Sequence, residues 1–421
     1  MEEGLSRNGL EFRDQCLGLK RVHQIFSILS APILFICGWE IPNGDAPTIQ
    51  SVQICLQVVS AAVLTVSHAE NRLMPPTTGF TFMTNDSGFF AGLDIGGTTV
   101  KSVMVDGNAE QVGGLVEVRS LVKEGYEATF KQLENALEQL ASGAGIDLGA
   151  IKGIGLDVPA PSSDGVIWGR ANLGEDWVGT DIRSKLSERL GLPVYMTNDG
   201  NAAALGEYAL RRKYHGSLLL VAPGTGLGGG LVLSGGSGYE GANGLALEVG
   251  HISVPFREDD GTLPVCSCGL KGCVEAWVSL VALRRRLRLE LAKPEWASHS
   301  LNEGDAPVEE KAFRLREFAE QGDALAIQIF KQQGFILGYA VADLVRVFDP
   351  GLVVVGGGLA ETSFRDQYMA WISEGFVDRA WPAYRHSPLD ATKETTHFEW
   401  AIGGDASAAI GMAFAAREMF Q

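Results

Sequence analysis

Four residues in the second half of the chain have the types and the spacing of a metal site. Cys266, Cys268 and Cys273 lie within eight residues, and His251 stands fifteen residues before the first of them. Three thiolates and one imidazole are the ligand set of a closed tetrahedral zinc site. A zinc ion with four protein ligands has no open position, so this set predicts a structural zinc that shapes a loop and does not activate water. The alternative is three unrelated buried thiols.

Asp199 is the candidate for acid–base chemistry. The apolar run Pro193–Thr197 before it predicts a short buried strand, and Gly200 is the expected turn into a helix over Asn201–Lys213. This arrangement places the carboxylate at a strand end that faces a cleft, where it could take the proton of an acceptor hydroxyl. The simpler alternative is that Asn198 and Asp199 only cap the helix.

Three glycine-rich segments each follow an apolar run and could bind a nucleotide. Such loops let bare backbone approach phosphate, threonine hydroxyls donate hydrogen bonds, and an aspartate can hold Mg²⁺ through water. A hairpin follows the second segment, which disfavours a Rossmann site, and a base or ribose could lie against the third. The alternatives are a plain hairpin turn for the first and a tight strand-to-helix turn for the third. The candidate residues are Asp94, Gly96, Gly97 and Thr98, then Gly224, Thr225 and Gly226, and finally Gly356, Gly357 and Gly358.

Two carboxylates flank the cysteine motif. Glu248 lies three residues before His251, and Glu275 lies two residues after Cys273. A metal-bound loop would hold both glutamates rigidly, and carboxylates accept hydrogen bonds from sugar hydroxyls well. His251 could also reach a ligand with its second ring nitrogen. The alternative for each glutamate is a solvated acid on a loop.

The elements that must position these residues form two similar halves, each with a strand, a glycine turn and a returning strand. This repetition indicates a duplicated α/β architecture. The first half is expected to contain strands at 89–93, 100–105, 112–118 and 151–158 and a helix at 127–140. The second half is expected to contain strands at 217–222, 231–233 and 352–355, a helical region at 278–348, and a closing helix at 405–419 capped by Asp405.

Size and charge limit the classes of function. With 421 residues, 46% of them apolar, the chain can form two domains and an additional segment. A formal net charge of −17 argues against a nucleic-acid-binding surface, and no Lys/Arg-rich stretch with interleaved aromatics offsets it. Small molecules are therefore the expected partners.

Residues 1–82 differ from the rest of the chain. Their apolar runs at 25–39 and 52–66 are interrupted by Pro32 and by glutamines, so neither reaches the roughly 18 uninterrupted apolar residues of a membrane span. We predict an N-terminal extension without a catalytic role, or a misassigned start, with translation from Met83 as for a cytoplasmic enzyme. A secretory leader or a membrane anchor is the alternative.

Six motifs together resemble the ROK family of sugar kinases and sugar-responsive repressors, over about residues 88–420. The cysteine motif is the most specific of them. The motifs are Leu93-Asp94-Ile95-Gly96-Gly97-Thr98, Asn198-Asp199-Gly200-Asn201-Ala202-Ala203, Gly224-Thr225-Gly226-x-Gly228, Glu248-x-Gly250-His251, Cys266-x-Cys268-Gly269-x2-Gly272-Cys273-x-Glu275 and Val355-Gly356-Gly357-Gly358.

The resemblance implies an α/β, actin-like, ribonuclease-H-like duplicated two-domain sugar kinase fold with an interdomain cleft that closes over ATP and a hexose. It implies that Asp199 is the catalytic base and that the glycine loops hold the phosphates and adenosine. The expected domains are 83–200, 201–403 and a closing helix at 404–421. The sugar-binding positions that it implies are Asn198, Glu248, His251 and Glu275, with Ala160 of Pro159-Ala160-Pro161 and Asn172 on the sugar-side loops.

The expected function is transfer of a phosphoryl group from Mg²⁺-bound ATP to the 6-hydroxyl of a hexose, in a cytoplasmic homodimer. Glucose is the first choice, because no epimerase domain is fused to the compact core. An N-acetylglucosamine or N-acetylmannosamine kinase is an alternative, because the wall around Pro159–Pro161 and Asn172 decides whether a 2-acetamido group fits. A non-catalytic sugar sensor that regulates transcription is a second alternative. The Asn198-Asp199 pair, and the lack of a basic winged helix-turn-helix pattern in residues 1–82, argue against a sensor.

Overall fold

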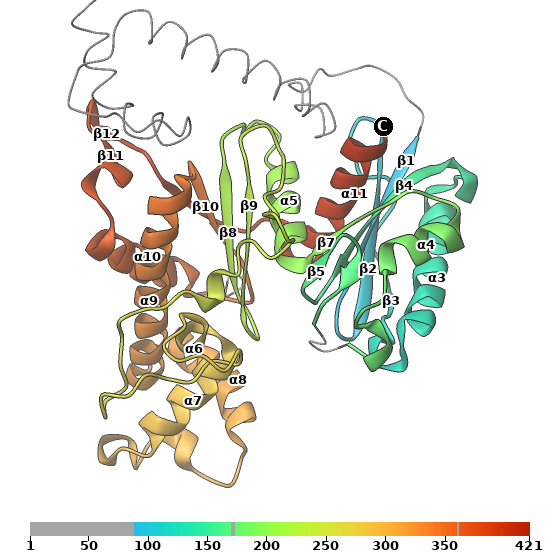
Figure 1. The fold of residues 1–421 in the computed structure, drawn as a ribbon. Helices are drawn as coiled ribbons and strands as arrows, with labels where there is room; N and C mark the ends of the chain where they lie inside the picture. The colour runs from blue at the N-terminus through green and yellow to red at the C-terminus, as the bar shows by residue number, and fades with distance from the viewer. Residues whose placement is uncertain (1–87, 170–172, 360–361) are drawn as a thin grey trace, which may run out of the picture. The chain divides into compact units, whose positions relative to one another are not determined.

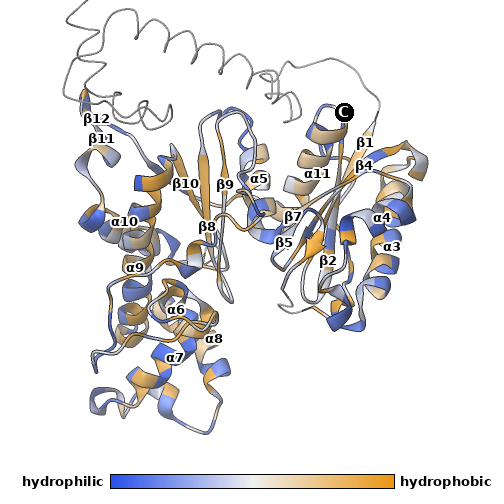
Figure 2. Ribbon diagram, viewed as in Figure 1, coloured by the Kyte–Doolittle hydropathy of each residue, from blue (hydrophilic) through white to orange (hydrophobic). Residues whose placement is uncertain are grey.

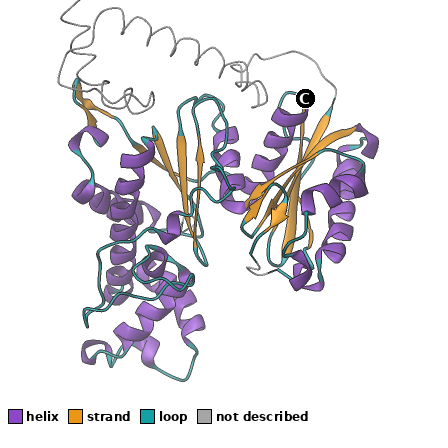
Figure 3. Cartoon of the chain, in the orientation of Figure 1, coloured by secondary structure: helices purple, strands orange, loops and turns teal. Residues whose placement is uncertain are grey.

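The computed structural model describes residues 88–169, 173–359 and 362–421, all within the unit Gly79–Gln421. The predicted extension 1–82 and Asn172 lie outside the described residues. Two main β-sheets with helices packed against them make up the described part (Figures 1 and 3). The central strands of both sheets are mostly apolar (Figure 2), and their buried side chains form the cores of the two halves.

The first sheet has the strand order β3-β2-β1-β4-β7. Strands β1, β2 and β3 pair antiparallel, whereas β4 is parallel to β1 and β7 is parallel to β4. Apolar residues of α3 pack in one core with those of β1 and β4. The elements are β1 (Phe89–Ile95), β2 (Thr99–Asp106), β3 (Val116–Arg119), α3 (Tyr126–Ala144), β4 (Ile151–Val158), the hairpin β5 (Ser162–Ser163) and β6 (Val166–Ile167), α4 (Ile182–Leu190) and β7 (Val194–Asn198).

The second sheet has the strand order β13-β10-β8-β9. It repeats the first sheet, because an antiparallel pair, β8 and β9, is extended by two parallel strands, β10 and β13. The elements are α5 (Asp199–Leu210), β8 (Leu218–Pro223), β9 (Leu227–Val232), α6 (Glu275–Val278), α7 (Leu280–Leu291), α8 (Val308–Glu320), α9 (Ala324–Phe348), β10 (Leu352–Val355), α10 (Arg365–Arg379), β11 (His386–Ser387), β12 (Asp390–Glu394), β13 (His397–Trp400) and α11 (Ser407–Phe420).

Helices α5 and α11 pack against each other and connect the two sheets. Helix α11 lies on β1 and β4 of the first sheet, and α5 lies on β8 and β9 of the second. Glycines make this close packing possible: a Cβ on Gly206 would come within 1.8 Å of the Ser407 carbonyl oxygen, and one on Gly411 within 2.0 Å of the Ala202 carbonyl oxygen. Among the described residues, no helix is long and apolar enough to cross a membrane.

Several predicted boundaries differ from the structure for local reasons. Strand β3 begins four residues later than predicted, because Gly113 takes a left-handed φ of 76°. Strand β9 begins four residues earlier than predicted, because its glycines belong to the strand, where Gly230 lies against Gly200. Helix α5 ends three residues early, where the Arg211 side chain turns back to bind Glu207.

The predicted cap of the closing helix is wrong. Asp405 lies in a 3₁₀ turn, Gly404–Ala406, before α11, and no side chain caps that helix. The Asp405 carboxylate instead forms an ion pair with Lys101 at 2.9 Å. This ion pair joins the start of α11 to β2 of the first sheet.

Candidate functional site

Three aspartates meet at one edge of the first sheet. Strands β1, β4 and β7 are adjacent and parallel, so their carboxyl ends lie together. Asp94 is the register partner of Asp157, and Asp199 follows directly after β7. Burial raises the pKa of both Asp94 and Asp157, and the nearby charge of Asp199 raises both further. Three carboxyl groups therefore lie at this edge, and the charge of Asp199 affects the pKa of the other two.

Asp199 occupies the first turn of α5. Asn198 caps this helix, because its side-chain oxygen accepts the Asn201 N–H at 2.8 Å, so the capping alternative holds for Asn198. The carboxylate of Asp199 accepts the N–H of Gly200 at 2.8 Å. Asp199 is exposed at the sheet edge, yet desolvation by the surrounding protein raises the pKa of its carboxyl. A partly desolvated, accessible carboxylate suits a general base.

The first glycine loop connects β1 to β2 beside Asp94. The Gly96 N–H donates to the Thr99 carbonyl oxygen at 2.9 Å, and a Cβ on Gly96 would lie 2.9 Å from that oxygen. Gly97 and Thr98 are exposed, and no atom would contact a Cβ on Gly97 within 4 Å. The loop thus offers open backbone beside a carboxylate, as a phosphate and Mg²⁺ site requires.

The second and third glycine loops lie side by side, because they follow the adjacent strands β8 and β10. The Gly224 N–H donates to the Gly226 carbonyl oxygen at 2.8 Å and closes the second loop. Gly357 has a φ of 81°, and a Cβ there would lie 2.0 Å from the Pro223 carbonyl oxygen. Only glycine allows such a close approach between the two loops.

Four metal-ligand atoms converge as the sequence predicts. The ligand atoms of His251, Cys266, Cys268 and Cys273 all lie within 4.8 Å of one another. The distance is 3.6 Å from His251 Nδ1 to Cys266 Sγ, and 3.8 Å from Cys268 Sγ to Cys273 Sγ. A tetrahedral zinc with bonds of about 2.3 Å to sulfur and about 2.0 Å to nitrogen would place its ligand atoms about 3.5 to 3.8 Å apart. The two distances agree with this range, so the four side chains form a group that could hold a metal ion.

Glu275 joins the cysteine motif to the second glycine loop. Its carboxylate accepts the Leu227 N–H at 3.0 Å and the hydroxyl of Ser267. Although burial raises the pKa of Glu275, these hydrogen bonds lower it below its ordinary value. A metal ion bound at the cysteines would consequently stabilise the loop that begins β9, a link that the sequence did not indicate.

Glu248 directly precedes the 3₁₀ turn Val249–His251 that carries the predicted histidine ligand. Burial raises the pKa of Glu248, the charge of His251 lowers it, and the charges of Asp199 and Glu275 raise it. Leu247, directly before it, has a left-handed φ of 65° and a buried side chain. A leucine in this conformation is strained, and its packing holds Glu248 in place.

The remaining predicted residue in the described part is Ala160. Its side chain is buried in the core of the first sheet, so only its backbone could meet a ligand. Two residues that the sequence analysis did not identify also border the site. Asp157 is the penultimate residue of β4, and Arg316 of α8 would meet a Cβ on Gly358 at 2.8 Å. The sequence could have indicated Asp157 as a site residue, because it is an acid near the end of a buried strand. The residues around Arg316 give no such indication.

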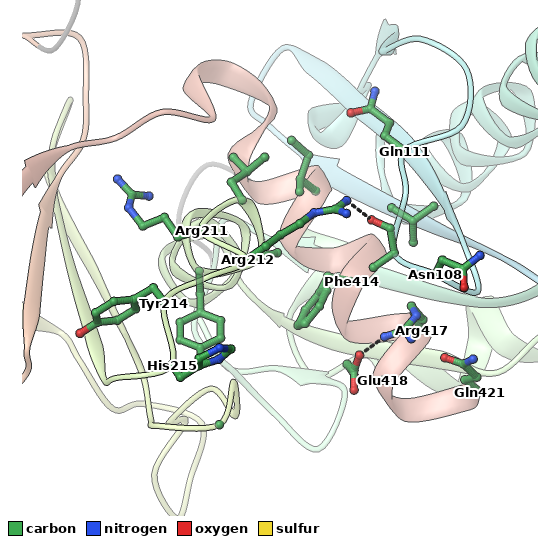
Figure 4. A pocket seen from close by; sticks show the side chains of 17 residues that line it. Asn108, Gln111, Arg211, Arg212, Tyr214, His215, Phe414, Arg417, Glu418 and Gln421 are labelled. Carbon is green, nitrogen blue, oxygen red and sulfur yellow. Dashed lines mark hydrogen bonds and ion pairs between the residues drawn. The ribbon is translucent and has the colours of Figure 1, made fainter. Parts of the chain in front are cut away.

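A cavity of about 520 Å³ lies elsewhere, between the β2–β3 turn and the carboxyl ends of α5 and α11 (Figure 4). None of the predicted site residues lines it. Arg212 in its wall is paired with Glu110, and Arg417 with Glu418. A smaller cavity of about 190 Å³ is bordered by Thr225, Gly226 and Glu275. Cys266 of the cysteine motif also lines this smaller cavity, so the cavity lies where the second glycine loop meets that motif.

The sequence pattern that defines the ROK family matches residues 90–418. A glucokinase of Thermotoga maritima is 30% identical over 295 residues, which are 68% of this chain and 89% of that protein. A xylose repressor of Caldicellulosiruptor bescii is 28% identical over 283 residues, which are 64% of this chain and 66% of the repressor. The crystal structure of a ROK family glucokinase from Streptomyces griseus in complex with glucose and AMPPNP superposes with a TM-score of 0.61, at 28% identity, over 79% of this chain and 100% of that one.

Proposed function

Because the chain belongs to the ROK family, we propose that it is an ATP-dependent hexose kinase that phosphorylates the 6-hydroxyl of glucose. The observation that carries the proposal is the position of Asp199, which follows β7 at the sheet edge where Asp94 and the first glycine loop end β1. The charge of Asp199 also acts on Glu248, which lies three residues before His251 of the predicted metal site. The glucokinase relative and the glucose–AMPPNP complex of the Streptomyces griseus protein support this choice of substrates.

In this mechanism the Asp199 carboxylate removes the proton of the 6-hydroxyl as that oxygen attacks the γ-phosphorus of ATP. The bond between the γ-phosphorus and the β–γ bridging oxygen breaks, and ADP leaves. Backbone N–H groups of the loops at Gly96–Thr98 and Gly224–Gly226 align the phosphates and stabilise their charge. Asp94 would hold Mg²⁺, which neutralises phosphate charge when bound. The products are hexose 6-phosphate, ADP and the proton on Asp199.

The sugar side of the site is proposed to consist of Asn198, Glu248, His251 and Glu275, with Ala160 and Asn172 on neighbouring loops. The metal at the cysteine motif is proposed to be zinc, because the donor set and the distances suit it. His251 would hold the metal through Nδ1, which lies 3.6 Å from Cys266 Sγ, and its Nε2 would then be free for a sugar hydroxyl. The segment that carries these residues would be held in place for sugar binding when the metal is bound.

A second candidate is a sugar-responsive regulator without kinase activity, which the xylose repressor relative favours. The carboxylate at Asp199 argues for the kinase, because a sensor needs no general base. We further propose a cytoplasmic homodimer, on the basis of the family resemblance. Sedimentation of the purified protein would test the dimer.

The deciding experiment is an ADP-release assay with Mg²⁺, ATP and one sugar at a time. Glucose is expected to give the highest kcat/KM among glucose, mannose, fructose, allose, N-acetylglucosamine and N-acetylmannosamine. A higher value for an N-acetylated sugar would assign the protein to that alternative class. Binding of a sugar without turnover of any of the six would favour the regulator.

A further inference from the structure

Asp157 is a fully buried acid whose polar neighbour is another acid. Its side chain is 0% exposed, its carboxyl group is hydrogen-bonded to that of Asp94, and neither of its oxygens accepts a hydrogen bond from an N–H or hydroxyl group in the described part of the chain. Glu207 and Glu290 are buried to the same degree, but Glu207 binds Arg211, and Glu290 binds Arg286 and Lys293. A buried carboxyl is normally paired with a cation or an N–H donor, whereas Asp157 faces a second carboxyl group, so a bound cation would stabilise the pair.

The carboxyl group of Asp157 faces the candidate site. Asp94 and Asp157 are register partners on parallel strands, as are Gly92 and Gly155 two residues earlier. Both glycines lie against α11, and side chains two residues apart on a strand share a face, so the two aspartates project from the same face of the sheet. The charge of Asp199 acts on both, which places the start of α5 nearby.

The nearby cation Lys101 lowers the pKa of Asp94, but it forms its ion pair with another acid. Lys101 is the register partner of Asp94 on β2, and its ammonium group forms an ion pair with Asp405 at 2.9 Å. Mg²⁺ is usually bound by one or two carboxylates together with water and substrate phosphates. Two carboxylates beside an open glycine loop provide that ligand set.

We propose that Asp157 is a second carboxylate ligand, beside Asp94, of the divalent cation that accompanies ATP. This inference rests on the proposed kinase function. It assigns the cation to the gap between the ends of β1 and β4, and it gives Asp157 a role in binding the metal. The competing role is structural: Asp157 would only hold the Asp94 side chain in place and leave the affinity for the cation unchanged.

The test measures Mn²⁺ as a spectroscopic substitute for Mg²⁺. Free Mn²⁺ is titrated by electron paramagnetic resonance with the full chain and AMPPNP, for the wild type and for Asp157→Asn. Loss of one carboxylate ligand is expected to weaken Mn²⁺ binding by about 10-fold or more, in the range seen when groups that support a metal site are removed. Binding of AMPPNP without metal should stay unchanged. Asp164→Asn, on the exposed β5–β6 turn, is the matched control and should bind Mn²⁺ as the wild type does.

Asp157→Ala provides a second variant, because alanine removes the carboxyl without adding a donor that could bind Asp94. It should lose Mn²⁺ affinity to a similar extent. Wild-type Mn²⁺ affinity in either variant would overturn the inference. A wild-type protein that binds no AMPPNP at all would instead overturn the proposed function, so the two failures are distinguishable.

Discussion

Asp199 combines two properties that a general base needs. Its carboxylate reaches solvent, where a hydroxyl can approach, and the surrounding protein raises its pKa above the ordinary value. A higher pKa makes the carboxylate a stronger base. The raised pKa of Asp199 should therefore be visible in the pH dependence of kcat.

We expect kcat to fall on the acid side at a pH above the ordinary aspartate pKa of about 3.9. The base must be deprotonated to act, and burial raises the pKa of Asp199, so its protonation begins at a higher pH than for a free aspartate. The measurement is kcat at saturating glucose and ATP, with recovery of activity at neutral pH as the control for unfolding. A constant kcat down to about pH 4 would contradict this role.

At the scale of single residues, the sequence indicates the candidate site residues that lie in motifs rich in glycine or cysteine. Asp94, Asp199 and the four metal ligands all lie in such motifs, and the structure brings the metal ligands together. Asp157 could not be placed, because its proximity to Asp94 depends on β1 and β4 being neighbours. Arg316 was missed because α8 meets Gly358 only through the tertiary fold.

The segment from His251 to Glu275 behaves as one element held by its proposed metal. We expect Cys268→Ser to lose the metal and to weaken glucose binding by about 10-fold or more, because the Glu275 that supports β9 would lose its anchor. Metal content by mass spectrometry and glucose affinity by calorimetry check this. Cys37→Ser, in the N-terminal segment, is the matched control. Loss of the metal with unchanged glucose affinity would refute the scaffold role.

The contact between α5 and α11 depends on glycine. Gly206→Ala would bring its Cβ within 1.8 Å of the Ser407 carbonyl oxygen, so the helices must separate. We expect it to lower the free energy of unfolding by about 1–3 kcal/mol, as overpacking does. Gly143→Ala is the control, because it lies within α3 with open space around it and should raise stability by up to about 1 kcal/mol. Urea unfolding measures both, and equal stability of the two variants would contradict the close contact.

At the scale of elements, sequence periodicity predicts the strands most reliably. The bounds of β4 and β10 agree with the prediction, because both strands are mostly buried and their sequences are dominated by apolar residues and glycine. The glycines of β9 could not be told from a loop, because their role depends on packing against α5, a contact that only the tertiary fold creates. Helix α5 ended early for a similar reason, since Arg211 also binds Glu399 of β13.

The duplicated architecture is a property of the whole molecule. The sequence indicates it through two glycine turns between paired strands, and both sheets extend an antiparallel pair by two parallel strands. The order of the strands and the placing of α11 on the first sheet depend on tertiary packing. The division at residues 200 and 201 stays a prediction.

A chain that starts at Met83 should retain kcat and the KM for glucose within about twofold, because every proposed site residue lies beyond that position. The assay compares it with the full chain, and circular dichroism controls for folding. A loss of turnover with the fold intact would show that residues 1–82 contribute to the site.

In the proposed mechanism, the carboxylate of Asp199 must lie between the phosphate loops and the sugar. Comparison of Asp199→Asn with the wild type, by turnover and by calorimetric glucose binding, tests this most directly. We predict that kcat falls by about 10²- to 10⁴-fold while the dissociation constant for glucose changes little, because asparagine preserves the shape of the site but cannot accept the proton. Turnover near that of the wild type would contradict the account.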